Sequence, residues 1–163
     1  YFDSVSDIIL NIFILISIWF ITDSNILYTL IAFLGIQLQG TLYNYYYTIL
    51  RNEFNGDTTS RVFEDEVPVA MKGEKQKHVD FLFKLYKIFY GKFDEIIYFL
   101  DRNAPKGNAL PKWFMTAVSI FGLGFQLLII SAMLVLNLKD YIIPFFIGYS
   151  VLILVFIGIR KLI

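Results

Sequence analysis

Long apolar segments joined by very short polar links dominate this sequence of 163 residues. A helix needs about 20 mainly apolar residues to cross the core of a bilayer, and four segments reach or approach that length: 5–21, 26–50, 113–136 and 141–159. Hydrophobic residues make up 57% of the chain, which is more than a soluble domain of this size can bury. The sequence therefore predicts an all-α integral membrane protein with four transmembrane helices, in a single transmembrane domain that covers 1–163.

Two short polar links pair these segments. Thr22-Asp23-Ser24-Asn25 and Asn137-Leu138-Lys139-Asp140 are rich in residues that favour turns and helix N-caps. Links this short make each pair of segments an antiparallel helical hairpin. A long polar link, 51–112, joins the two hairpins.

Positive charge is concentrated in that long link. Eleven of the 14 Lys and Arg residues lie there: Arg51, Arg61, Lys72, Lys75, Lys77, Lys84, Lys87, Lys92, Arg102, Lys106 and Lys112. Lys and Arg accumulate in cytoplasmic loops of membrane proteins, so we expect a multi-pass protein with the link 51–112 and the residues around Asp3 and Asp7 at the cytoplasmic face. The net charge is zero, so composition gives no reason to expect a nucleic-acid partner.

Part of the link has a helical pattern. Between Val79 and Leu100 polar residues recur every three to four positions among Phe, Leu, Ile and Tyr. This spacing predicts one amphipathic helix, and such a helix can lie in the headgroup plane as an interfacial helix. A turn is expected at 55–57, where the sequence is Asn-Gly-Asp.

The candidate chemistry lies at the start of the chain. Asp3 and Asp7 are four residues apart, so their carboxylates share one face of a helix. Ionisable groups at membrane depth are costly and mark function by default, and two neighbouring carboxylates suit a hard divalent cation such as magnesium or manganese. A structural interpretation also holds, in which both are N-terminal acids that complement the helix dipole. The chain has no cysteine, so thiolate ligands and cysteine nucleophiles are excluded.

The string Phe-Asp-Ser-Val-Ser-Asp at 2–7 resembles the second half of the signature of the CDP-alcohol phosphotransferase family, also called the CDP-alcohol phosphatidyltransferase family. That signature reads D-x2-D-G-x2-A-R, a spacer and then G-x3-D-x3-D over two neighbouring transmembrane helices. Asp3 and Asp7 match the closing D-x3-D. The earlier elements of the signature would precede Tyr1, so we expect the chain to start inside a longer protein of about six spans.

The resemblance implies an enzyme of phospholipid biosynthesis that transfers a phosphoalcohol group from a CDP-linked donor to an alcohol acceptor and releases CMP. It implies Mg²⁺ or Mn²⁺ as the cofactor, Asp3 and Asp7 as metal ligands, and Asp7 as the general base. It adds membrane lipid and a second copy of the chain to the expected partners, because family members are commonly dimers. Without the first half of the motif the fragment alone is expected to be inactive. The alternative is a non-enzymatic multi-span membrane subunit for transport or assembly.

Two further sets of residues have open interpretations. Gln37, Gln39, Thr41, Asn44 and the tyrosines at 43 and 45–47 either line a polar cavity or form interhelical hydrogen bonds and an interfacial aromatic belt. Gly122, Gly124 and Gly148 are expected to permit close helix packing.

Overall fold

The computed structural model describes residues 1–53, 67–107 and 109–163, and every regular element in these ranges is a helix. The turn predicted at 55–57 and the basic residue Arg61 lie outside the described residues. In chain order the α-helices are α1 (Phe2–Thr22), α2 (Ile26–Glu53), α3 (Gln76–Phe89), α4 (Gly91–Leu100), α5 (Lys112–Val118), α6 (Leu123–Val135), α7 (Ile142–Tyr149) and α8 (Leu152–Leu162). Short 3₁₀ turns occupy η1 (Ala104–Lys106), η2 (Ser119–Phe121) and η3 (Lys139–Tyr141).

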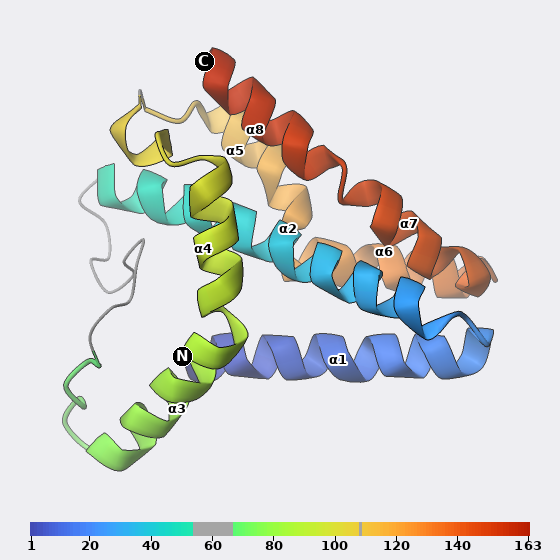
Figure 1. Ribbon diagram of the computed structural model, residues 1–163, viewed down its shortest axis with the longest axis horizontal. Helices are drawn as coiled ribbons and strands as arrows, with labels where there is room; N and C mark the ends of the chain where they lie inside the picture. Colours follow the sequence, from blue (N-terminus) through green and yellow to red (C-terminus); the bar gives the residue numbers. More distant parts are fainter. Residues whose placement is uncertain (54–66, 108) are drawn as a thin grey trace.

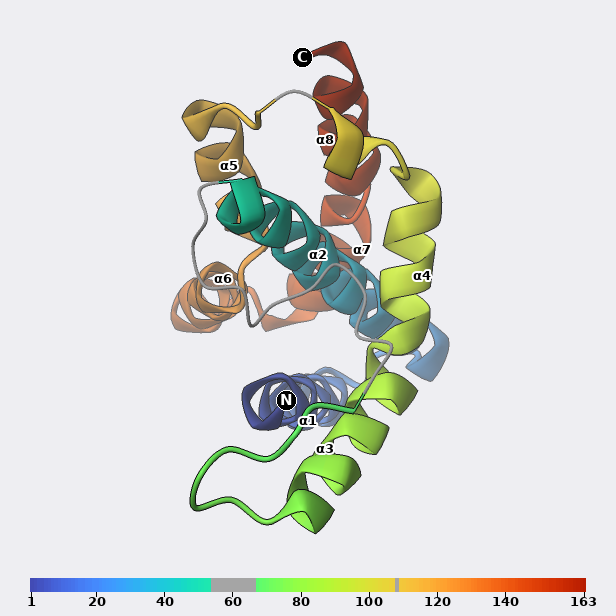
Figure 2. The same cartoon turned by 90° about the vertical axis from the view of Figure 1, so that its left-hand side faces the viewer.

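Helix α2 is the central element of the fold. It packs against α1, α4, α5, α7 and α8, and Figure 2 shows it with these helices arranged around it. Two clusters of buried apolar side chains fill the bundle. One joins α1, α2, α6 and α7 towards the hairpin turns, and the other joins α2, α4, α5 and α8 towards the opposite end.

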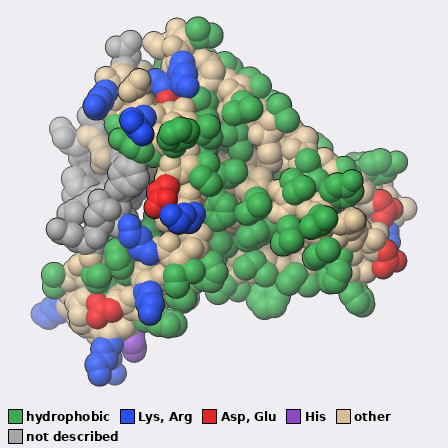
Figure 3. All heavy atoms as spheres, in the orientation of Figure 1, with side chains coloured by type: hydrophobic (Ala, Val, Ile, Leu, Met, Phe, Trp, Pro, Cys, Tyr) green, Lys and Arg blue, Asp and Glu red, His purple; other side chains and the backbone are tan. Residues whose placement is uncertain are grey.

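The outer surface of the helices is apolar. Phe13 on α1 is 66% exposed, Phe20 is 78% exposed and Leu27 on α2 is 63% exposed. Figure 3 shows hydrophobic side chains over most of the face in view, with Lys and Arg gathered over the α3–α4 side. Water would solvate such a surface poorly, whereas lipid chains solvate it well. The arrangement is that of a membrane protein.

Within the part of the chain that the structure describes, three helices are long and apolar enough to cross a membrane: Phe2–Thr22, Ile26–Asn52 and the combined segment Lys139–Leu162. They correspond to the predicted segments 5–21, 26–50 and 141–159. The predicted span 113–136 is not one straight helix. It is broken at Gly122 into a pair bent by 52°, Lys112–Phe121 and Leu123–Val135. The structure therefore gives three candidate spans, or four if the bent pair crosses as one.

The break has a local cause at Gly122. Its backbone is extended, with ψ of 146°, so it caps α6 rather than continuing the preceding turn. The carbonyl of Gly122 then accepts hydrogen bonds from the amides of Phe125 and Gln126, at 3.0 and 3.1 Å. α6 therefore begins after Gly122 as a separate helix, with a direction different from that of the preceding turn.

Both hairpin turns form as predicted, and they lie at the same end of the molecule (Figure 1). Asp23 and Asn137 adopt left-handed backbone conformations, with φ of 47° and 56°. The side chain of Asn25 accepts a hydrogen bond from the amide of Leu27 at 2.8 Å, which caps α2. The ammonium group of Lys139 donates to the carbonyl of Ile21 at 2.9 Å and joins the two turns.

The prediction of one amphipathic helix over 79–100 is wrong, because the structure has two helices, α3 and α4, that separate at Tyr90. Gly91 follows, a residue that disfavours a helix interior. α3 packs against α1 and α4 packs against α2, so the break lets one link cover two differently oriented helices (Figure 1). The break also buries Tyr90, which is 9% exposed.

A buried ion pair fastens the end of α4 to α8. Arg160 donates hydrogen bonds to both carboxylate oxygens of Asp101, through Nε at 2.6 Å and through Nη2. Two α2 hydroxyls complete the network: Tyr46 donates to the Asp101 carboxylate at 2.7 Å and Tyr45 donates to the Asp101 carbonyl at 2.9 Å. Asp101 is 1% exposed, so its charge depends on these partners.

The Arg160→Met variant tests this network. Removing one member of a buried pair leaves an uncompensated charge and costs about 3–5 kcal/mol, whereas replacing both members by apolar groups is far less costly. We expect Arg160→Met to lower the free energy of unfolding in detergent by that amount, and the double variant Asp101→Leu/Arg160→Met to be more stable than the single one. If Arg160→Met were as stable as the wild type, Asp101 and Arg160 would not form the buried ion pair described above.

Close helix packing occurs at Gly35 rather than at the predicted glycines. A Cβ atom at Gly35 would lie 2.1 Å from Oγ of Ser150 at the end of α7, whereas one at Gly124 or Gly148 would meet nothing within 4 Å. A Cβ at Gly122 would lie 3.1 Å from the carbonyl oxygen of Ser119, within its own turn. The prediction is therefore wrong for Gly124 and Gly148.

We expect Gly35→Ala to destabilise the protein by about 1–3 kcal/mol, the usual cost of forcing an extra methyl group into a packed interface. Gly148→Ala is the matched control on the partner helix, where open space makes the change neutral or slightly stabilising. Thermal unfolding of both variants in detergent is the measurement. Equal unfolding temperatures would show that α2 and α7 do not approach as closely as described.

Candidate functional site

The predicted site residues Asp3 and Asp7 lie on the first two turns of α1, which begins at Phe2. Asp3 is exposed and Asp7 is half-buried. The two carboxylates are close enough for the charge of Asp3 to act on Asp7. The spacing therefore gives the shared helix face that the sequence predicted.

Aromatic side chains hold this end of α1 against the link. The ring of Tyr1 lies 5.5 Å from that of Phe83 and 5.2 Å from that of Tyr86, in edge-to-face geometry. Tyr86 stacks on Tyr90 at 5.5 Å, and the hydroxyl of Tyr90 donates to the carbonyl of Ser4 at 3.0 Å. The link thus fixes the position of the turn that carries the two carboxylates.

Asp7 borders a cavity of about 210 Å³. Its walls come from α1, α2, the α3–α4 junction and the start of α6, and Asp7 is the one charged residue among the described residues that line it. The lining residues are Asp7, Asn11, Ile36, Gln37, Gly40, Tyr43, Asn44, Tyr90, Gly122, Leu123 and Gln126. Asp3 is not part of the lining and lies one helical turn away along α1.

The side chain of Gln37 is buried, at 3% exposure, and its Nε2 has no hydrogen-bond partner among the described residues. A buried amide without an acceptor is destabilising by about 1–3 kcal/mol. Thr41, one turn further along α2, also has a buried hydroxyl without a partner, but it does not line the cavity. Gln37 therefore has an unsatisfied hydrogen-bond donor and also lines the cavity.

The neighbouring polar side chains are satisfied. Gln126 donates to the side-chain carbonyl of Gln39 at 3.0 Å and to the main-chain carbonyl of Ile36 at 3.3 Å. Gln39 donates to Ser150 at 3.0 Å, and Ser150 donates to the carbonyl of Phe146 at 2.8 Å. This network joins α2, α6 and α7 inside the apolar bundle and forms the back of the cavity through Gln126.

The first turn of α6 also faces the cavity, through Gly122 and Leu123. The first amides of a helix have no intrahelical acceptors and carry partial positive charge. That end of α6 is therefore electrostatically complementary to the Asp7 carboxylate. Irregular backbone inside a membrane is tolerated where it lines a cavity of this kind.

The structure decides between the two interpretations of the α2 polar residues one by one. Gln37, Tyr43 and Asn44 line the cavity, whereas Gln39 forms interhelical hydrogen bonds and Thr41 does neither. Sequence reasoning missed three polar lining residues: Asn11, Tyr90 and Gln126. Asn11 had a detectable signal, because it follows Asp7 by four positions on an otherwise apolar helix.

No group of three or more His, Cys, Asp or Glu side chains that could hold a metal ion occurs in residues 1–53, 67–107 and 109–163. Asp7 is the carboxylate in the cavity lining, and Asp3 lies one helical turn outside it on the same helix. Magnesium commonly binds to proteins through one or two carboxylates, with substrate phosphate and water as its other ligands. Two carboxylates on one helix face fit that pattern.

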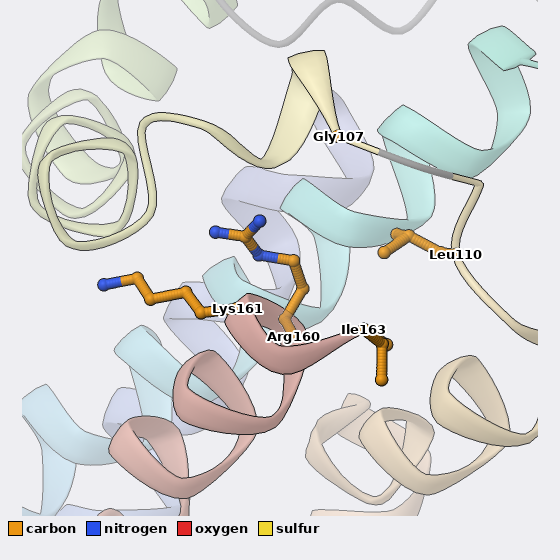
Figure 4. A pocket seen from close by; sticks show the side chains of 5 residues that line it. All are labelled: Gly107, Leu110, Arg160, Lys161 and Ile163. Carbon is orange, nitrogen blue, oxygen red and sulfur yellow. The ribbon is translucent and has the colours of Figure 1, made fainter.

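A second hollow of about 180 Å³ lies at the end of α8, lined by Gly107, Leu110, Arg160, Lys161 and Ile163. Figure 4 shows Arg160 and Lys161 leaving α8 in different directions. The guanidinium group of Arg160 is already bound to Asp101. Because Arg160 lines it, this hollow lies directly beside the Asp101–Arg160 ion pair.

Comparison with protein-family models, with curated proteins and with solved structures finds no match to this chain.

Burial raises the pKa of the Tyr90 hydroxyl above its ordinary value of about 10, and the negative charges of Asp7, Asp94 and Asp3 raise it further. The folded protein keeps this proton at a pH where the unfolded chain has lost it. The stabilisation from protonated Tyr90 is therefore complete below about pH 10 and is lost as the pH rises above that value.

We expect Tyr90→Phe to be about 1 kcal/mol less stable than the wild type at neutral pH, because it loses the hydrogen bond to Ser4. Above about pH 10 the difference should shrink and then reverse, since only the wild type must keep a phenol protonated there. Unfolding in detergent across this pH range measures the effect. If the stability difference between Tyr90→Phe and the wild type stayed constant with pH, the pKa of Tyr90 would not be raised in the folded protein.

Proposed function

We propose that the protein catalyses metal-dependent transfer of a phosphoalcohol group, of the phosphatidyl type, from a CDP-linked donor to an alcohol acceptor, with release of CMP. The observation that carries this proposal is the position of Asp7, the one charged residue in the lining of a polar cavity between apolar helices. A carboxylate in such surroundings is costly and is kept for function. The resemblance of residues 2–7 to the phosphotransferase signature supplies the reaction class.

In this reaction the hydroxyl oxygen of the acceptor attacks the phosphorus that bears the donor's alcohol, and a new P–O bond forms. The P–O bond to CMP breaks, and CMP leaves with the electron pair. Asp7 accepts the proton that the attacking hydroxyl loses. A carboxylate base requires a position within hydrogen-bond reach of that hydroxyl, and the cavity gives an alcohol room beside Asp7.

Asp3 and Asp7 would hold Mg²⁺ or Mn²⁺, because hard divalent ions prefer carboxylate oxygens. When bound, the ion supplies charge neutralisation at the donor diphosphate. Like charges on the two carboxylates favour a cation between them. Asp3 is exposed and Asp7 is half-buried, so an ion from solution could reach both carboxylates.

The proposed topology has four spans, with the bent pair α5–α6 crossing the membrane as one. The long link and the chain ends then share one side, and both hairpin turns lie on the other. The Lys and Arg residues on the α3–α4 side support a cytoplasmic position for the link (Figure 3). α3 and α4 would lie at that membrane surface, beside the entrance to the cavity.

The second candidate is a non-enzymatic membrane subunit for transport or assembly. The feature that favours it is the broken helix at Gly122, whose new N-terminus borders a polar cavity. Discontinuous helices of this kind form substrate sites in transporters. The two candidates differ in one measurable respect, which is turnover of a CDP-linked donor.

The test is manganese-dependent CMP release from CDP-linked lipid donors by the full-length protein in detergent, with a panel of alcohol acceptors. Loss of a general base lowers the rate by about 10²–10⁴-fold, so we expect Asp7→Asn to lose at least a hundredfold of kcat. Asp23→Asn is the matched control, since Asp23 lies in the hairpin turn with a left-handed backbone that Asn also favours.

Asp23→Asn should release CMP at the wild-type rate. Absence of CMP release across all donors and acceptors, with Asp7→Asn indistinguishable from the wild type, would reject the enzymatic proposal and favour the membrane subunit.

A further inference from the structure

The polar side chains that line the cavity beside Asp7 indicate which class of ligand it binds. We propose that it binds a neutral alcohol with several hydroxyl groups, and that Gln37 donates a hydrogen bond from Nε2 to one of the ligand's oxygens. The identification of this ligand as the acceptor alcohol rests on the proposed function, whereas its binding does not.

The open donor on Gln37 is the first reason. Nε2 of Gln37 has no partner among the described residues although the side chain is 3% exposed. Polar side chains at membrane depth normally satisfy each other, and the adjacent Gln39 and Gln126 do so. A ligand oxygen in the cavity would supply the acceptor that Gln37 lacks, and the lining position of Gln37 makes this contact possible.

The composition of the lining is the second reason. Asn11, Gln37 and Asn44 contribute amides, and Tyr43 contributes a hydroxyl. Amides offer both donors and acceptors, and each hydroxyl of a polyol is also both. A ligand with several hydroxyl groups can therefore pair with more of this set than a simple alcohol can.

The charge of the lining is the third reason. The described lining residues include no Lys or Arg, and Asp7 is their one carboxylate. An acceptor that carries phosphate would find no Lys or Arg side chain in the described lining to pair with it. An ammonium group has no acceptor, so only an oxygen of the ligand can take the hydrogen bond that Gln37 offers. A neutral polyol needs no ionic partner and offers several such oxygens.

The experiment measures binding of radiolabelled inositol and glycerol, as neutral polyols, to the full-length protein in detergent without a CDP-linked donor. Glycerol 3-phosphate and choline serve as the anionic and cationic comparisons. We expect saturable binding of a neutral polyol, preferred over both charged compounds. Gln37→Met, which keeps the side-chain length but removes the amide, should weaken that binding about tenfold, the scale of one hydrogen bond.

Thr41→Val is the matched control, because it removes another buried and unpartnered polar group from the same helix but outside the cavity. It should bind the polyol as the wild type does. Thermal unfolding gives a second readout. Gln37→Met should unfold at or above the wild-type temperature, since it removes an unpaired amide, whereas a purely structural glutamine would lose stability on substitution.

Preference for a charged alcohol, no saturable binding of either polyol, or wild-type binding by Gln37→Met would each overturn the inference. The outcomes remain separate from those of the enzymatic proposal. Polyol binding without CMP release with any donor would leave the inference intact and reject the phosphotransferase. CMP release with charged acceptors alone, together with no saturable binding of either polyol, would reject the inference and leave the phosphotransferase intact.

Discussion

The buried carboxylate of Asp101 connects three parts of this chain: the first hairpin, the link that carries α3 and α4, and the second hairpin. It follows α4, it is bound by Arg160 of α8, and it accepts a hydrogen bond from Tyr46 of α2. A charge at that depth is stable only while its partners stay in place, so the network fixes the link helices relative to both hairpins. At the other end of α4, Tyr90 donates to the carbonyl of Ser4 on α1. α4 is thereby attached at both ends, and Tyr90 at its first end lines the cavity beside Asp7.

Two groups of polar side chains stand out within the bundle. Gln39, Gln126 and Ser150 satisfy one another and join α2, α6 and α7. Gln37 and Asp7 face the cavity instead, and Gln37 has no protein acceptor for its Nε2. The satisfied network is sufficient to explain helix association. Packing does not explain the unsatisfied amide of Gln37 or the carboxylate of Asp7.

Several elements of the fold could be predicted from local sequence. The apolar lengths predicted the spans of α1, α2 and the α7–α8 segment, and the turn residues predicted both hairpins. Local reasoning was wrong where tertiary packing opposed it. The helical pattern of 79–100 continues through Tyr90, yet the chain separates into two helices there because α3 and α4 pack on different partners. In the same way, the close approach of α2 and α7 occurs at Gly35, which has no local signal that separates it from Gly124 or Gly148.

The sequence by itself determined the helical class, the apolar character of the outer surface and the shared face of Asp3 and Asp7. These follow from composition and from the helical repeat, which act over a few residues at a time. Tertiary structure alone decided which polar residues meet. Asn11, Gln37, Tyr90 and Gln126 come from different elements, and their gathering around Asp7 depends on the break at Gly122 and on the two attachments of α4. A cavity is a property of several helices packed together, so no pattern within one of them specifies it.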